Sequence, residues 1–300
     1  MKTFHQLAEL PPFSEPLALT IGNFDGVHLG HQAVFAALPK NRIRVALSFQ
    51  NHPSEVVGAA ARPRLCTPTH RQKLLAEQPL DLLLLLNFTP ALAQQTPEQF
   101  LATLRRHLPF TDLTLGHDAA FGKGRQGDSS HIRSLAQSMG FTIDYLPLFS
   151  CSAGQPITSS RIRNLISTGD LSAASTLLGR PYSLHGTVIR GRQLGRTLGF
   201  PTANMDVSSL CLPPLGIYTS TFTHNNTRYP SISSLGIAPT VRNTLLLETH
   251  LLFHSLDLYD QPAEVTLHTY LRPELTFPSL SSLRTQIAAD VTYAKSLQND

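Results

Sequence analysis

Cysteine is scarce in this chain of 300 residues, and so are long hydrophobic runs. The three cysteines lie far apart and form no CxxC pair, which argues against a disulfide framework and a cysteine-based zinc site. The longest apolar run, the leucines at 82–86, is bounded by Asp81 and Asn87 and is far too short to cross a membrane. The N-terminal residues lack the hydrophobic segment of a secretory signal. We therefore expect a cytoplasmic protein with reduced thiols and no membrane partner.

A strong charge of one sign is also missing. The formal net charge is +4 and the isoelectric point is about 9.1, without a long basic run or a basic stripe with interleaved aromatic residues. A nucleic-acid groove is therefore not indicated, and the mild positive balance suits small anionic ligands such as nucleotides. Hydrophobic residues make up 41% of the chain, which is ample for a packed core, and the length suggests two domains.

The first half of the chain alternates strand-like apolar runs with helical patterns. Strands are expected at 16–21, 42–49, 80–88, 112–118 and 141–149. Thr96 is a candidate N-cap for the helix after the third of these runs, with Pro97 as its first residue. The alternation predicts a parallel, doubly wound, Rossmann-like sheet, in which ligands bind beyond the carboxyl ends of the strands.

The pattern changes after a short helical segment at 170–179. Short β-rich runs follow, HNN at 224–226 is a good turn between two of them, and an amphipathic helical pattern ends the chain. The second half therefore predicts a small β-barrel with a terminal helix. We place the domain boundary near residue 180, with one domain over 1–180 and the other over 181–300.

The stretch GNFDGVHLGHQ (22–32) directly follows the first expected strand. His28 and His31 are three residues apart, so they share one face at the start of the expected helix, where backbone N–H groups favour phosphate. Gly26 and Gly30 let a phosphate approach the backbone, and two imidazoles can stabilise the charge that grows in a phosphoryl transition state. The alternative is a capped helix with exposed histidines. The coincidence of strand end, glycine turn and helix start favours the phosphate site.

A second stretch, ITSSRIR (157–163), supplies hydroxyls and arginines at an expected helix start. Ser159 and Ser160 can hydrogen-bond to phosphate, and Arg163 can grip it with two N–H groups. The alternative is a helix N-cap followed by a solvated basic face.

A third stretch, GTVIRGRQLGRTLGFPTANM (186–205), is the most specific one in the second half. Gly191 and Gly195 allow phosphates to approach closely. The hydroxyl of Thr202 and the carbonyl oxygen of Asn204 suit the hard cation Mg²⁺. The alternative is an ordinary β-turn with an asparagine, and the long glycine-rich, basic lead-in argues against it.

Three stretches of the first half resemble the adenylyltransferase part of the prokaryotic bifunctional riboflavin kinase/FMN adenylyltransferase (FAD synthetase) family. These are GNFDGVHLGHQ, SFQNHPSEVV and ITSSRIRNLISTGDLSAASTLLGRPYSL. The resemblance implies a nucleotidyltransferase domain of the HxGH type, in which His28 and His31 are catalytic. The residues that it implies for binding ATP and its phosphates are Gly22, Asn23, Gly26, Gly30, His52, Ser159, Ser160 and Arg163. The FMN phosphate attacks the α-phosphorus of ATP and pyrophosphate leaves, so catalysis is positioning plus electrostatics.

One loop of the first half, GHDAAFGKGRQGD (116–128), departs from the family pattern. Asp118 stands where the family usually has an asparagine, and Ala119 and Ala120 replace bulkier residues, whereas Phe121 is retained. We expect Asp118 and Phe121 to contact the flavin. An aspartate near a triphosphate is unfavourable unless it meets Mg²⁺ or a hydrogen-bond donor.

The second half resembles the riboflavin kinase part of the same family. The stretches that carry the resemblance are LGIYTSTF, SSLGIAPTV, LLLETHLLFHSLDLY and LRPELTFPSLSSLRTQIAAD. The family fold here is a six-stranded barrel with a C-terminal helix. The resemblance implies that Thr202 and Asn204 bind Mg²⁺ with ATP beside Gly191 and Gly195. It also implies that Glu248 takes the proton from the riboflavin 5′-hydroxyl; otherwise Glu248 is an exposed strand carboxylate.

Together these features predict an enzyme that makes FMN from riboflavin and then FAD from FMN, with ATP as co-substrate and Mg²⁺ as cofactor. Its expected partners are riboflavin, FMN, FAD, ATP, ADP and pyrophosphate, without nucleic acid. One alternative is a single-activity riboflavin kinase with a degenerate adenylyltransferase domain. Another is a flavin-binding protein without turnover, against which the full set of catalytic residue types argues.

Overall fold

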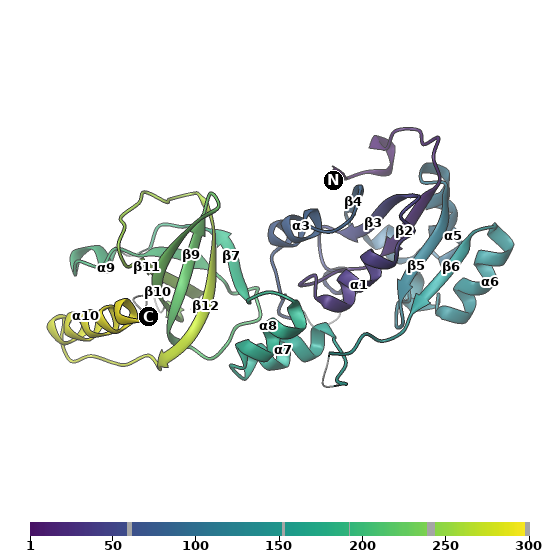
Figure 1. The fold of residues 1–300 in the computed structure, drawn as a ribbon. Coiled ribbons are helices and arrows are strands. Elements are labelled where there is room, and N and C mark those ends of the chain that lie inside the picture. The colour runs from purple at the N-terminus through teal and green to yellow at the C-terminus, as the bar shows by residue number, and fades with distance from the viewer. Residues whose placement is uncertain (59–61, 152–153, 192, 239–243, 298–300) are drawn as a thin grey trace. The chain divides into compact units, whose positions relative to one another are not determined.

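The computed structural model describes residues 1–58, 62–151, 154–191, 193–238 and 244–297. The chain forms two compact units, Met1–Arg62 with Pro68–Arg161, and Pro63–Thr67 with Ile162–Asp300 (Figure 1). Contacts therefore group residues 162–180 with the second unit, and the domain boundary expected near residue 180 stays a prediction. The end of the motif SSLGIAPTV, at 239–241, lies outside the described residues.

A six-stranded parallel sheet forms the centre of the first unit. In spatial order its strands are β1 (Lys2–Phe4), β4 (Leu82–Leu86), β3 (Ile43–Phe49), β2 (Leu17–Ile21), β5 (Phe110–Gly116) and β6 (Thr142–Leu146). The sheet confirms the Rossmann-like prediction and adds β1 at one edge. The chain leaves β2 toward β3 on one side and later returns to β5 on the other. The winding therefore reverses at the carboxyl end of β2, the place where such sheets bind ligands.

Helices connect the strands of the first unit. They are α1 (Leu29–Ala37), α2 (Pro53–Val56), α3 (Pro68–Ala76), α4 (Pro90–Ala93), α5 (Pro97–His107) and α6 (Ser129–Met139), with the short turns η1 (Leu7–Glu9) and η2 (Lys123–Arg125). Thr96 caps α5, and its side chain and that of Gln99 exchange hydrogen bonds with the backbone, which confirms the predicted start of this helix. Leu19, Leu47 and Phe110 are fully buried in the core of this unit.

A six-stranded antiparallel barrel forms the second unit. In spatial order its strands are β7 (Ser183–Thr187), β12 (Pro262–Arg272), β9 (Gly216–His224), β10 (Thr227–Ala238), β11 (Thr244–Leu251) and β8 (Ala203–Asp206). A backbone bridge from Ile189 to Asn204 links the two ends of this order and nearly closes the barrel. Asn225 and Asn226 turn between β9 and β10 with positive φ angles of 49° and 61°, which confirms the predicted turn.

Side chains from alternate positions fill the barrel. Tyr218, Phe222, Leu235, Leu247 and Val265 are among its buried residues. Outside it, α10 (Leu280–Ser296) packs through Val291 and Ala294 on Ile232 and Leu252, which confirms the terminal helix (Figure 1). The remaining helices are α7 (Ser159–Ser167), which spans the division between the units, α8 (Leu171–Leu178) and α9 (Leu194–Thr197). Nowhere in the described part is a helix long and apolar enough to cross a bilayer.

Candidate active sites

The loop between β2 and α1 has an unusual backbone. Phe24 and Val27 are buried and have positive φ angles of 50° and 42°, on either side of Gly26 at 77°. Such conformations cost roughly 1–3 kcal/mol in residues other than glycine, and they persist where the surroundings fix them, often at functional sites. A Cβ atom on Gly22 would lie 2.7 Å from the Phe24 ring, so this glycine makes room for that ring.

The structure brings the two predicted catalytic histidines together at the start of α1. His28 is the N-cap, and its Nδ1 accepts a hydrogen bond of 3.3 Å from the backbone N–H of His31. Because Nδ1 accepts, the proton of neutral His28 is on Nε2, where it can be donated to a ligand. The two rings stack with centroids 3.6 Å apart and an angle of 16° between their planes.

The surroundings of His31 keep its ring neutral. Burial, and then the charge of His28, hold the pKa of the His31 ring well below its usual value, so His31 is neutral in the free protein. Within the part of the chain that the structure describes, its buried Nδ1 has no hydrogen-bond partner. A nearby phosphate would favour the protonated ring, because an opposite charge stabilises the charged form.

Arg71 was not predicted, although it connects the ends of two central strands. Its guanidinium donates to the backbone and side-chain oxygens of Asn23, at 3.0 and 2.9 Å, and to the carbonyls of Phe49 and Gln50. The side chain is buried in α3 and ties the loop after β2 to the end of β3. The side-chain oxygen of Asn23, a predicted ATP-binding residue, is thus fixed by Arg71. The sequence around Arg71 indicates only a helix, because these partners lie far away along the chain.

His52 lies at the carboxyl end of β3, next to β2 in the sheet. It caps α2, and its Nδ1 lies 2.6 Å from the Ser54 hydroxyl. The preceding Asn51 exchanges two hydrogen bonds of 2.8 and 2.9 Å with the backbone of Phe88, as if it extended the pairing of β3 with β4. His52 is therefore held at the edge of the sheet where a nucleotide is expected.

Part of the ITSSR stretch lies against the histidine turn. The Ser159 hydroxyl is 3.4 Å from the carbonyl oxygen of Asp25, and a Cβ atom on Gly30 would lie 3.3 Å from the carbonyl oxygen of Ile157. Ser160 is exposed. Arg163 belongs to the second unit, where its Nε donates to the Pro63 carbonyl at 2.7 Å. Its role in phosphate binding stays a prediction.

The loop 116–128 folds over the start of α5. Cβ atoms on Gly122 and Gly127 would come within 3.0 Å of Pro97, and the Phe121 ring packs edge-on against Phe100 at 5.5 Å. Phe121 therefore anchors the loop. Asp118 is exposed; Arg125 donates to its carbonyl at 3.0 Å, and its carboxylate lies 3.7 Å from His117 Nδ1. The predicted flavin contacts of Asp118 and Phe121 stay predictions.

The second unit brings together residues that are far apart in the sequence. Asn204 on β8 and Glu248 on β11 are direct partners in the antiparallel register. Partners of this kind point to the same face of a sheet, so the predicted metal ligand and the predicted base are neighbours. Asn204 is buried, whereas Glu248 is exposed.

The glycine-rich lead-in lies close to this pair. A Cβ atom on Gly191 would be 2.7 Å from Nδ2 of Asn204, and one on Gly195 would be 3.4 Å from Oγ1 of Thr202. Nδ2 of Asn204 donates to the Thr202 carbonyl at 3.3 Å, which leaves the amide oxygen as its acceptor. The described residues contain no cluster of three or more His, Cys, Asp or Glu for a metal ion. The oxygens of Thr202 and Asn204 nevertheless suit Mg²⁺, which keeps several waters and takes further ligands from nucleotide phosphates.

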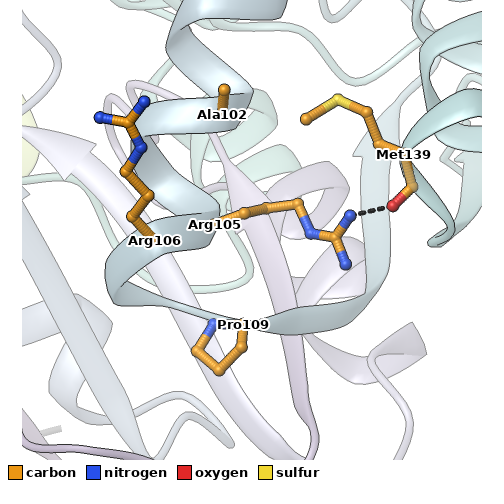
Figure 2. Close-up of a pocket in the computed structure, with 5 residues that line it drawn as sticks. All are labelled: Ala102, Arg105, Arg106, Pro109 and Met139. Carbon is orange, nitrogen blue, oxygen red and sulfur yellow. Dashed lines mark hydrogen bonds between the residues drawn. The ribbon is translucent and has the colours of Figure 1, made fainter.

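A cavity of about 400 Å³ lies where α5 and α6 end (Figure 2). Its lining residues are Ala102, Arg105, Arg106, Pro109 and Met139. Arg105 donates to the Met139 carbonyl, and its guanidinium lies 5.7 and 5.6 Å from the ring centroids of Phe110 and Phe141. These contacts give Arg105 a packing role. Pro109 directly precedes β5, so the cavity lies at the amino ends of the strands, whereas the histidines lie at their carboxyl ends.

Comparisons with known proteins agree with both halves of the chain. The FAD synthetase family model matches residues 10–161, and the riboflavin kinase family model matches residues 178–298. The bifunctional riboflavin kinase/FMN adenylyltransferase of Haemophilus influenzae is 36% identical over 94% of each chain. The enzyme of the same name from Escherichia coli K12 is 34% identical over 98% of this chain and 96% of its own.

A solved structure is also similar over nearly the whole chain. A crystal structure described as a macrolide-efflux protein from Streptococcus pneumoniae covers 98% of both chains with a TM-score of 0.81 and 24% identity, and it bears on the fold alone. The predicted fold class is confirmed by the sheet, the barrel and the family matches. From the match of both halves, in this order, it follows that the chain belongs to the family of bifunctional riboflavin kinases/FMN adenylyltransferases.

Proposed function

We propose that this chain makes FMN from riboflavin and ATP in its second unit, and FAD from FMN and a second ATP in its first. The observation that carries the proposal is that each half of one chain holds its own set of reactive groups. The first has stacked histidines at the carboxyl end of β2, and the second has Asn204 paired with Glu248. ATP is the co-substrate of both family activities.

In the adenylyl transfer, a phosphate oxygen of FMN attacks the α-phosphorus of ATP. The new P–O bond forms as the bond to the β-phosphate breaks, and pyrophosphate leaves. Nε2–H of His28 donates to a phosphate oxygen, and a ring N–H of His31 donates a hydrogen bond as negative charge collects beside it, without proton transfer. The backbone N–H groups at the start of α1 face the same charge. No covalent enzyme intermediate is needed, because the groups act by positioning and by charge stabilisation.

In the phosphorylation, the 5′-hydroxyl of riboflavin attacks the γ-phosphorus of ATP and ADP leaves. Glu248 accepts the hydroxyl proton, a step that comes late in loose phosphoryl transfer. Thr202 and Asn204 would hold Mg²⁺, which when bound supplies positive charge at the ATP phosphates. Gly191 and Gly195 leave space for the phosphates beside them, because a side chain on either would meet Asn204 or the Phe200 carbonyl.

The test is a product assay on the purified protein. Riboflavin, Mg²⁺ and ATP are incubated with it and the flavins are separated. FAD supports both activities. FMN alone supports a kinase whose loop around Asp118 no longer serves adenylyl transfer, and unchanged riboflavin contradicts the proposal. The dependence on Mg²⁺ is tested by adding a chelator.

A cytoplasmic location and the lack of a nucleic-acid partner stay predictions.

A further inference from the structure

His250 lies two residues after Glu248 on β11 and is half-buried. Its Nδ1 is 2.9 Å from the carbonyl oxygen of Pro201. A carbonyl oxygen can only accept, so Nδ1 of His250 carries a proton and donates it. The β8–β11 register, continued by one residue beyond the pair of Ala203 with Thr249, sets Thr202 opposite His250. The histidine is therefore next to the Asn204–Glu248 pair and on the same face.

Two side chains hold the backbone around Thr202. His250 donates to the carbonyl before it, that of Pro201, and Asn204 donates to the carbonyl of Thr202 itself at 3.3 Å. Pro201 has no N–H group, so its carbonyl is the one backbone group through which this residue can be hydrogen-bonded. The backbone of the turn that carries Thr202 is thus held from both sides.

The ring of His250 is itself fixed by packing. It meets the Phe200 ring edge-on, with centroids 5.6 Å apart and planes at 84°. Phe200 in turn packs on the cluster between the barrel and α10. Burial lowers the pKa of His250, and the charge of Lys295 lowers it further, against the opposing effect of the bond to Pro201. The bond to Pro201 requires a proton on Nδ1.

We propose that His250 is a positioning residue of the kinase site: its Nδ1–H bond to Pro201 fixes the turn that presents Thr202 to magnesium-bound ATP, beside Glu248. The proposal rests on the proposed role of Thr202 in binding Mg²⁺ with ATP. His250 touches neither substrate nor metal in this scheme and acts only through the turn.

Three substitutions separate the hydrogen bond from the packing. His250→Leu keeps an apolar side chain against Phe200 and removes the donor. His250→Asn places an amide N–H close to the position of Nδ1, and His250→Gln places it one carbon further out. We expect His250→Leu to raise KM for magnesium ATP in riboflavin phosphorylation by about three- to tenfold, the range for one net hydrogen bond. His250→Asn should recover most of this loss and His250→Gln should not.

Two further measurements test whether the effect is confined to the kinase site and which ring nitrogen of His250 carries the proton. FMN adenylylation by the same variants should stay at the parent level, because that reaction belongs to the other unit. Nuclear magnetic resonance of ¹⁵N-labelled histidine, with the His250 signals identified by their loss in His250→Asn, should show the Nδ1–H form. An Nε2–H form would overturn the proposal.

The kinetic outcomes are equally decisive. An unchanged KM for magnesium ATP in His250→Leu, or equal KM values in the Leu and Asn variants, would overturn the role of His250. A parent protein that makes no FMN would instead contradict the proposed function. Thr202→Val should raise the same KM; if it does not, Thr202 is no ligand and the proposal for His250 falls with it.

Discussion

The side chain of His28 has two roles, helix capping and the proposed phosphate binding, that can be separated by substitution. Its Nδ1 caps α1. Its Nε2–H is the group proposed to donate to a phosphate oxygen. His28→Asn keeps a side-chain oxygen that can cap the helix, whereas His28→Ala loses both functions. We expect both variants to lower FAD formation from FMN by ~10²-fold or more, the scale for one lost transition-state donor. Only His28→Ala should also destabilise the unit, by about 1 kcal/mol.

The measurements for His28 are the FMN-to-FAD rate, the riboflavin-to-FMN rate and thermal unfolding by circular dichroism. Riboflavin phosphorylation should be nearly unchanged in both variants. A loss of both activities in a folded variant would show that His28 is wrongly assigned to one site.

Glu248 is the proposed general base of riboflavin phosphorylation. Glu248→Gln keeps the shape and the hydrogen bonds of the side chain but removes its ability to accept a proton. FMN formation should fall by ~10²–10⁴-fold, the usual contribution of a general base. KM for magnesium ATP should change little because Thr202 and Asn204 remain, and adenylylation of added FMN should continue. Paired assays on one purified variant test this, and normal FMN formation would leave Glu248 as a surface strand residue.

The functional residues that the sequence predicts and those that it misses differ in how far away their partners lie along the chain. His28 caps α1 and His31 is the third residue of that helix, so their contact arises within one helix start. Asn204 and Glu248 become neighbours only through the strand register, which depends on every turn between them. Arg71 and His250 act on carbonyl groups of distant segments, and no spacing rule contains that information.

At the scale of elements, the strands of the first half can be predicted from the sequence because buried parallel strands are continuous apolar runs. Strands β2 to β6 lie inside or within a residue or two of the expected segments, whereas β1 has three residues, too few to show a pattern. In the second half, the sequence predicts the HNN turn and the terminal helix. It does not predict the strand order, since an antiparallel barrel is closed by pairings such as β7 with β12 between the first and last parts of the domain.

Arg71 affects the arrangement of elements, because its side chain joins the loop after β2 to the end of β3. Arg71→Lys keeps the charge but cannot donate in two directions to Asn23 and to the end of β3. We expect it to destabilise the first unit by about 2–3 kcal/mol, since buried carbonyls lose a charged donor. FAD formation should fall while FMN formation continues. Lys73→Ala, on the exposed side of the same helix, is the matched control and should leave both rates unchanged.

Chemical denaturation followed together with the two activities tests this prediction. The transition of the first unit should shift to lower denaturant in Arg71→Lys, and the kinase activity should survive that transition. A variant with parental stability and parental FAD formation would show that the loop after β2 needs no support from α3.

At the scale of the molecule, the two activities should be separable. The barrel strands, α10 and the residues assigned to the kinase site, from Gly191 to His250, all lie within 181–300. A fragment beginning at Pro181 should therefore fold, phosphorylate riboflavin and make no FAD. Contacts outside that fragment also belong to the second unit: Arg64 exchanges backbone hydrogen bonds with Ser209 and Cys211, and Cys211 Sγ lies 3.5 Å from the Arg163 carbonyl.

These contacts lead to a graded expectation for fragments of different length. A fragment beginning at Ile162 keeps α8 and Arg163, whose carbonyl lies near Cys211 Sγ, so it should unfold at a higher temperature than the fragment beginning at Pro181. Both should have the riboflavin kinase rate of the full chain, because neither start cuts the barrel or the PTAN turn. Thermal unfolding and the two flavin assays on both fragments and the full chain provide the comparison. An insoluble or inactive Pro181 fragment beside an active Ile162 fragment would move the domain boundary to the start of the second compact unit. Failure of both fragments, with an active full chain, would mean that residues 63–67 or the first unit are needed to complete the barrel domain.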